Sequence, residues 1–129
     1  MSELRCMVVT PEQTELDKTT DSVTVPLFDG ELGILTGHSP LVGRLGYGVL
    51  RLGVEGNSQE YFIEGGFVQV ADNIVSVLTD KVSPRSEVTK SMAEKAMSEA
   101  LQLPMEQPEQ KAARDKAVAR AQALVRVAS

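Results

Sequence analysis

The chain has 129 residues, 42% of them hydrophobic, a length that indicates one domain or one domain with a small appendage. The net charge of −5 argues against general nucleic-acid binding, and no apolar run approaches the roughly 18 residues that a membrane span needs. Aromatic residues make up only 4% and tryptophan is absent, so we expect an aliphatic core.

The N-terminal part, to about residue 82, is predicted to form short strands. Segments such as LRCMVV and VTVPLF are rich in apolar and β-branched residues, and GVLRLGV alternates in polarity. The stretch from Glu60 to Asp80 predicts two strands joined at Asp72-Asn73, a turn-forming pair. Strands recurring about every 8 to 12 residues with Gly-rich turns indicate an antiparallel sandwich or barrel. Cys6, the single cysteine, is predicted to be a small buried hydrophobe.

From Thr89 the chain is rich in Ala, Glu, Lys and Met, and the pattern becomes helical. Ser91 and Glu94 fit a capping box at its start, although Thr89 could cap instead. Prolines in LPMEQPEQ break this helix, and a second helix is expected from about Pro108, a natural first-turn residue. The short link predicts an antiparallel helical hairpin. The apolar faces comprise Met92, Ala93, Ala96, Met97, Ala100 and Leu101 in the first helix and Ala117, Ala121, Leu124 and Ala128 in the second.

These helical faces are mostly alanine, which buries little apolar surface. One buried methyl group is worth about 0.8 kcal/mol, against roughly 1.5–3 kcal/mol for a leucine, so we predict a hairpin that opens or detaches at modest cost. A static C-terminal cap is the alternative. Charge also divides the chain: residues 1–85 carry six basic and twelve acidic side chains, whereas residues 104–129 carry five basic and three acidic ones. An acidic body and a basic end suggest surfaces that meet different partners.

The stretch DGELGILTGHSP, residues 29–40, carries the local chemistry worth testing. It has no phosphate-binding glycine pattern and precedes a predicted strand rather than a helix, which excludes a phosphate cradle. His38 could act as a base beside Ser39, with Asp29 to orient it, but neighbouring residues of an extended chain point to opposite faces. His38 is the single histidine and Cys6 is isolated, so no metal set is complete. The sequence therefore predicts no catalytic residues, no cofactor and no metal.

The remaining interpretation of this stretch is a shaped surface. Gly37 is expected at positive φ, where glycine is tolerated best, and Pro40 restricts the residue before it to an extended conformation. Ile34 and Leu35 would anchor the loop, while His38 and Glu31 would point outward. A turn histidine with satisfied hydrogen bonds is the alternative for His38.

Two longer runs carry a family likeness. VPLFDGELGILTGHSPLVGRLGYGVLRL, followed by FIEGGFVQVADNIVSVLTD, resembles the epsilon subunit of F-type ATP synthases, and the Ala-rich hairpin extends this resemblance over essentially the whole chain. The matching residues are Gly30, Glu31, Gly33, Ile34, Gly37, His38, Pro40, Gly48, Gly65 and Gly66.

The resemblance implies a ten-stranded N-terminal β-sandwich, residues 1–85, and a C-terminal helix-turn-helix, residues 86–129. It implies a non-catalytic rotor subunit of a proton- or sodium-driven ATP synthase, which couples the gamma subunit to the c ring while the active sites lie on beta. The subunit would be peripheral, on the cytoplasmic face of a bacterial inner membrane, and would meet the membrane only through the complex.

The resemblance also implies roles for particular residues. Glu31 would lie at the c-ring end, and His38, with Gly37 and Pro40, close to gamma. The hairpin would extend along gamma and block ATP hydrolysis by contacting alpha and beta. The basic residues that would make these inhibitory contacts are Arg114, Lys116, Arg120 and Arg126.

One departure from the family pattern concerns nucleotide. Some members bind ATP through an Ile/Leu-Asp-x-x-Arg-Ala motif, and the matching residues here run from Val88 to Ala93. Thr89 replaces the aspartate and Met92 replaces the arginine, which argues against ATP binding. Two alternatives remain beside the regulatory subunit: the same coupling subunit with a static, non-inhibitory hairpin, and a small-molecule-binding sandwich with a helical lid.

Overall fold

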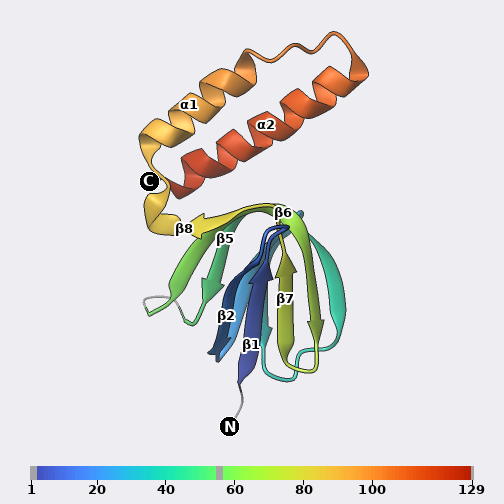
Figure 1. Cartoon of the computed structure of the whole chain (residues 1–129), viewed down its shortest axis with the longest axis vertical. Coiled ribbons are helices and arrows are strands. Elements are labelled where there is room, and N and C mark those ends of the chain that lie inside the picture. Colours follow the sequence, from blue (N-terminus) through green and yellow to red (C-terminus); the bar gives the residue numbers. More distant parts are fainter. Residues whose placement is uncertain (1–2, 55–56, 129) are drawn as a thin grey trace. The chain divides into compact units, whose positions relative to one another are not determined.

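Strands come first and helices last along the chain (Figure 1). The computed structural model describes residues 3–54 and 57–128 and divides into two units, residues 1–84 and 85–129. The first unit contains β1 (Leu4–Val9), β2 (Thr14–Thr20), β3 (Ser22–Leu27), β4 (Gly30–Leu35), β5 (Leu41–Leu52), β6 (Gln59–Ala71), β7 (Ile74–Leu78) and β8 (Val82–Pro84). The second contains a 3₁₀ turn (Arg85–Glu87), α1 (Lys90–Leu101) and α2 (Pro108–Val127).

The strands pair in the order β2-β1-β7-β6-β5-β3-β4, and β8 pairs with β6. Every pair is antiparallel except β1 and β7, which run parallel. The predicted β architecture followed by a helical hairpin is confirmed, but the described residues form eight strands rather than about ten, in a mixed sheet. The longest of these strands are β5 and β6, with 12 and 13 residues.

The long strand β6 changes neighbour at Gly65 and Gly66. Phe67 lies opposite Leu78 of β7, and Ile63 lies opposite Val82 of β8, so one register continues across the break between those two strands. Gly65 has φ +72° and Gly66 has φ +110°. A Cβ at Gly66 would collide with the carbonyl group of Leu78, so the two backbones approach more closely here than any other residue type allows.

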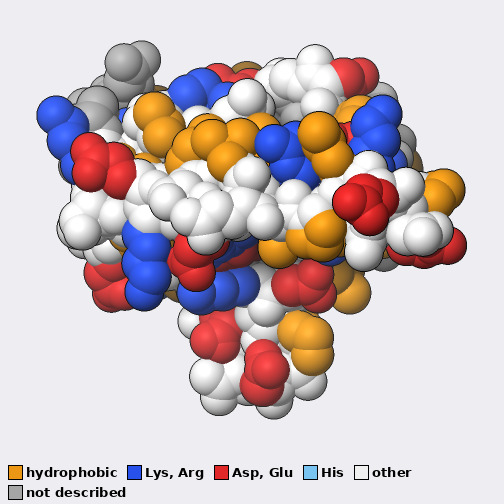
Figure 2. Space-filling view, turned by 90° about the horizontal axis from the view of Figure 1, so that it is seen from above, with side chains coloured by type: hydrophobic (Ala, Val, Ile, Leu, Met, Phe, Trp, Pro, Cys, Tyr) orange, Lys and Arg blue, Asp and Glu red, His pale blue; other side chains and the backbone are white. Residues whose placement is uncertain are grey.

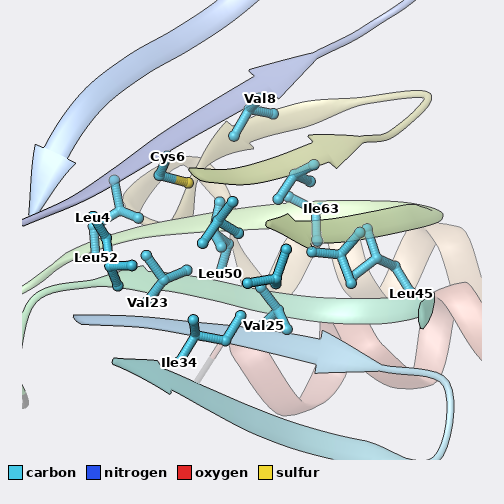
Figure 3. Packing of buried hydrophobic residues seen from close by; sticks show 14 residues of the cluster. Leu4, Cys6, Val8, Val23, Val25, Ile34, Leu45, Leu50, Leu52 and Ile63 are labelled. Atoms are coloured by element: carbon cyan, nitrogen blue, oxygen red, sulfur yellow. The ribbon is translucent and has the colours of Figure 1, made fainter. Parts of the chain in front are cut away.

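The core of the first unit is aliphatic, as predicted (Figure 3). Each buried valine, leucine or isoleucine contributes roughly 1.5–3 kcal/mol. Cys6 is fully buried among them, and burial raises the pKa of its thiol to about 12. The buried cluster consists of Leu4, Cys6, Val8, Val23, Val25, Ile34, Leu45, Leu50, Leu52, Ile63, Val68, Val70, Val75 and Val77.

The turn between β6 and β7 confirms the Asp72-Asn73 prediction. Ala71 pairs with Ile74, which leaves these two residues as the whole connection. Asp72 has φ 52° and Asn73 has φ 63°, the left-handed pair that two-residue hairpins favour because its twist matches the strands. Both residue types tolerate this region better than most, since their short polar side chains can bond locally.

Thr89 caps the N-terminal end of α1. Its hydroxyl oxygen accepts a hydrogen bond from the amide of Met92 at 3.2 Å. The Ser91–Glu94 capping box is therefore wrong and the Thr89 alternative is confirmed, because Thr89 is the last extended residue and Ser91 already lies in the first turn. Pro108 opens α2 as predicted.

The two helices form an antiparallel hairpin (Figure 1). Its seam is poor in large side chains, and Leu124 is the single fully buried leucine among the described residues of α1 and α2. No helix in the described residues is long and apolar enough to cross a membrane. The buried helical side chains are Ala93, Ala100, Ala121, Ala123 and Leu124.

Candidate functional site

An exposed apolar face lies on the outer side of β5, β6 and β7. We define the apolar face as Val42, Phe67, Ile74 and Leu78, which strand alternation places on the side opposite the core. Val42 is 73% exposed, Phe67 59% and Leu78 49%, although Phe67 and Leu78 are cross-strand partners. Val42 is diagonal to the Phe67–Leu78 pair, and Ile74 lies on the same side further along β7, beyond Ser76. Exposed apolar side chains gathered on one side of a sheet mark a surface that another protein covers.

A basic residue borders the apolar face. Arg44 lies opposite Phe67 across β5 and β6, and its guanidinium stacks over the ring of Phe28 at 4.6 Å from the ring centroid. The amide of Phe28 donates a hydrogen bond to the carbonyl oxygen of Arg44 at 2.8 Å, which fixes the turn between β3 and β4 beside this strand. The exposed aromatic ring is thus held rigidly next to the apolar face.

The apolar face was not predicted from the sequence, because the stretch that forms β6 and β7 was interpreted only as two strands, with no side assigned to solvent. The signal was present in FVQV: Phe67 and Val68 are neighbours and so face opposite sides of the sheet, which makes both sides apolar. A strand with one solvated side would instead alternate strictly between polar and apolar residues.

The loop between β4 and β5, residues 36–40, contains three of the predicted partner residues. Gly37 has φ +83°, which confirms its expected positive φ. Ile34 is buried as expected of an anchor, but Leu35 is 65% exposed and does not anchor the loop, because neighbouring strand residues face opposite sides of the sheet. The His38 amide donates to the Leu35 carbonyl oxygen at 3.1 Å, and the Nδ1 of His38 donates to the Ser39 carbonyl oxygen at 2.7 Å. The imidazole is therefore bonded to backbone, rather than to the Ser39 hydroxyl as a nucleophile–base pair would require.

The same loop is tied to the β6–β7 turn. The Gly37 amide donates to Oδ1 of Asn73 at 2.7 Å, across 36 residues of sequence. The carbonyl oxygen of Asn73 accepts from the Arg5 amide at 2.9 Å. Asn73 thus bonds to both the loop and the start of β1. The next residue in the chain is Ile74 of the apolar face.

Glu31 is separated from this loop. It is exposed, is the second residue of β4 and pairs with Pro26 of β3, beside the turn between those strands. His38 follows the other end of β4. The structure therefore brings Gly37, His38 and Pro40 together and places Glu31 at the opposite end of the strand, as two separate partner contacts would need.

The basic residues of α2 lie at different depths. Lys116 and Arg126 are exposed, whereas Arg114 and Arg120 are half-buried. On the face shown in Figure 2, Lys and Arg side chains are interspersed with acidic and apolar ones rather than gathered in one basic patch. Attraction of α2 to an acidic segment would thus come from a few ion pairs.

Among the described residues, no group of three or more His, Cys, Asp or Glu side chains is placed to hold a metal ion. Arg5 and Asp17 form a bidentate ion pair on the sheet surface, with Nη2 to Oδ2 at 2.7 Å and Nε to Oδ1 at 2.9 Å. Hydrogen bonding from Arg5 lowers the pKa of the Asp17 carboxyl, which makes it a structural carboxylate rather than a proton donor.

Comparison with known proteins agrees with this geometry. Residues 3–85 match the family model described as ATP synthase, Delta/Epsilon chain, beta-sandwich domain. The chain is 49% identical over 123 residues to the ATP synthase epsilon chain of Rhodopirellula baltica, covering 95% of this chain and 96% of that one. It is 38% identical over 103 residues to the ATP synthase epsilon chain of Symbiobacterium thermophilum, covering 78% and 74%.

Two solved structures share the fold. A chain of the Euglena gracilis mitochondrial ATP synthase, solved as OSCP/F1/c-ring, matches with a TM-score of 0.82 and 24% identity, covering 96% of this chain and 80% of that one. A chain of the Tetrahymena thermophila mitochondrial ATP synthase, solved as central stalk and c-ring, matches with a TM-score of 0.77 and 19% identity, covering 98% and 96%. Both similarities extend over the strands and the helices.

Proposed function

This chain belongs to the family of ATP synthase epsilon chains, non-catalytic subunits of that complex, and we propose that it couples the gamma subunit to the c ring. The family resemblance expected from the glycine pattern is thereby confirmed, and with it the absence of an enzymatic role for this subunit. The epsilon chain belongs to the central stalk of the synthase. The partner contacts and the regulatory role form the rest of the proposal.

The apolar face carries the assignment of gamma as partner. Covering a large apolar side chain is worth about 1.5–3 kcal/mol, so the exposed surface of Val42, Phe67 and Leu78 supplies a strong reason to bind another protein. The loop with Gly37, His38 and Pro40 joins this face through Asn73 and supplies polar contacts at its edge.

Glu31 supports a separate contact with the c ring. It lies at the far end of β4 from His38, beside the β3–β4 turn, where Gly30 adopts φ +141°. Asp29 and Glu31 are both exposed there, and a turn that presents two carboxylates suits the polar loops of the c ring. In this arrangement, gamma and the c ring bind different surfaces of one rigid unit.

We further propose that the hairpin restrains ATP hydrolysis by contacting alpha and beta. Its seam is mostly alanine, so opening it exposes little apolar surface. Exposed ion pairs contribute about 0–1 kcal/mol each and weaken with salt, yet several from α2 can bias two hairpin states that differ by a few kcal/mol. A static, non-inhibitory hairpin is the competing proposal.

Nucleotide is not part of the proposal. The hydroxyl oxygen of Thr89, which stands where the ATP-binding relatives have an aspartate, already caps α1 by accepting from the Met92 amide. The side chain of Met92, which stands in place of the arginine, offers no charge for a phosphate.

As a subunit of the synthase, the chain would act peripherally, on the cytoplasmic face of a bacterial inner membrane, and reach the bilayer only through the complex.

The hairpin role is tested by ATP hydrolysis of the assembled enzyme. We expect removal of residues 86–129, or joint substitution of Arg114, Lys116 and Arg120 by alanine, to raise hydrolysis at low salt. The gain from the triple variant should shrink as salt rises, because exposed ion pairs are screened. If both variants hydrolyse ATP at the wild-type rate at every ionic strength, the inhibitory role is refuted and the static, non-inhibitory hairpin is supported.

The gamma contact is tested by capture of purified gamma. Phe67→Glu places a charge on the apolar face and should weaken capture at least tenfold. Val54→Glu is the matched control, because Val54 is 56% exposed, close to the 59% of Phe67, yet lies outside the apolar face. Equal capture by both variants would show that gamma binds elsewhere.

A further inference from the structure

Asn73 occupies an unusual position in the first unit. Its side-chain oxygen Oδ1 accepts the Gly37 amide at 2.7 Å, and its carbonyl oxygen accepts the Arg5 amide at 2.9 Å. The residue lies in a two-residue turn, is exposed, and directly precedes Ile74 of the apolar face. It thus joins the turn that starts β7, the loop between β4 and β5, and the N-terminal end of β1.

The turn itself does not need this side chain. Asp72 and Asn73 both have positive φ, a conformation that glycine adopts with no more strain than either residue. What asparagine adds is an acceptor at a fixed place, since the short side chain leaves Oδ1 close to the turn backbone. Gly37, at φ +83°, turns its amide towards that acceptor.

The other hydrogen bonds given for the described residues of this loop are local. The His38 amide bonds to the Leu35 carbonyl oxygen, and the His38 ring bonds to the Ser39 carbonyl oxygen, so both bonds stay within the loop and its preceding strand. These bonds shape the loop but do not place it. The Asn73 bond, by contrast, links it to a segment 36 residues away.

We propose that Asn73 is a positioning residue, which holds the loop of residues 36–40 in line with the apolar face so that gamma meets one continuous surface. This inference rests on the proposed function, because it assigns a role to a residue that supports the gamma contact. Asn73 acts through the loop, by fixing the Gly37 amide and with it the direction in which His38 and Pro40 are presented.

The test compares two glycine substitutions in the full-length chain. Asn73→Gly keeps the positive φ of the turn and removes the acceptor, whereas Asp72→Gly keeps the positive φ and leaves the acceptor in place. A single hydrogen bond of this kind changes an equilibrium about threefold to tenfold. We therefore expect Asn73→Gly to speed hydrogen exchange of the Gly37 amide, and to weaken gamma binding, by about that factor, with Asp72→Gly close to wild type in both.

A third variant checks that the acceptor matters. Asn73→Asp retains an oxygen within reach of the Gly37 amide and should restore slow exchange and most of the gamma affinity. Urea unfolding should give midpoints near that of the wild type for Asp72→Gly and Asn73→Asp, and Asn73→Gly should lower the folding equilibrium constant by no more than the same threefold to tenfold, since it loses one hydrogen bond. A purely structural role would lower that constant by more than this factor and leave the exchange of the Gly37 amide no more affected than that of the amides in β4.

The outcomes separate this inference from the proposed function. Unchanged exchange of the Gly37 amide in Asn73→Gly would overturn the positioning role. Faster exchange with unaltered gamma affinity would overturn it as well, because releasing the loop from Asn73 would then have no effect on gamma binding. A wild-type chain that fails to bind gamma would instead refute the proposed function and this inference with it.

Discussion

The two adjacent glycines of β6 offer a sharp test of the structure. Both have positive φ, +72° at Gly65 and +110° at Gly66, so an alanine is strained at either position. They differ in what a new methyl group would meet. At Gly65 there is nothing within 4 Å, whereas at Gly66 the carbonyl carbon of Leu78 and the Cα of Thr79 would each lie at 2.9 Å.

This difference sets the expected magnitudes. The left-handed conformation costs an alanine about 1–2 kcal/mol, and we assign that cost to Gly65→Ala. Gly66→Ala bears at least the same strain and must also separate β6 from the backbone that follows β7. We expect a total of about 4 kcal/mol or more, in the range that single substitutions reach only by a specific steric or packing mechanism. Against a typical stability of about 5–15 kcal/mol, Gly66→Ala would leave a marginal fold.

Urea unfolding of the two variants and the wild type, followed by circular dichroism, measures the difference directly. We expect the midpoint to fall modestly for Gly65→Ala and by several-fold more for Gly66→Ala. Capture of gamma should survive in the first variant and be lost in the second as the sandwich unfolds. Equal midpoints for the two variants would refute the close approach of β6 to the backbone of Leu78 and Thr79, and with it our account of the change of neighbour at Gly65 and Gly66.

Three further predictions follow from local geometry. Burial raises the pKa of the Cys6 thiol to about 12, so this thiol should react with alkylating reagents at pH 8 only as fast as the chain unfolds. The free energy of unfolding should also fall as the pH rises above about 8.5, the pKa of a cysteine in the unfolded chain. Rapid labelling of the folded protein would contradict this prediction. Gly37→Val should disturb gamma binding more than His38→Ala, because a β-branched residue is strongly disfavoured at φ +83°, and normal capture by the valine variant would speak against it. Isothermal titration of the isolated chain should show no ATP binding at micromolar concentrations, since Thr89 caps α1, whereas a saturable isotherm would reveal a site we have not identified.

Local features were predictable because few residues determine them. The Asp72-Asn73 turn follows from the tolerance of these side chains for positive φ, and the start of α2 follows from the fixed φ of Pro108. The aliphatic core follows from a composition with only 4% aromatic residues and no tryptophan. The capping box at Ser91 failed because two polar residues offered similar caps two positions apart, and only the backbone conformation of Thr89 decides between them.

The sequence by itself thus determined the order of strands and helices, the aliphatic character of the core and the family. The tertiary structure alone decided which strands are neighbours, including the parallel pairing of β1 with β7, because alternation looks the same for either direction. It also decided that Asn73 meets Gly37, that Gly66 meets the backbone of Leu78, and that Phe67 and Leu78 form one exposed face. These contacts join residues far apart in the chain, and they arise when the whole sheet buries its aliphatic side chains at once, which no short stretch of sequence can encode.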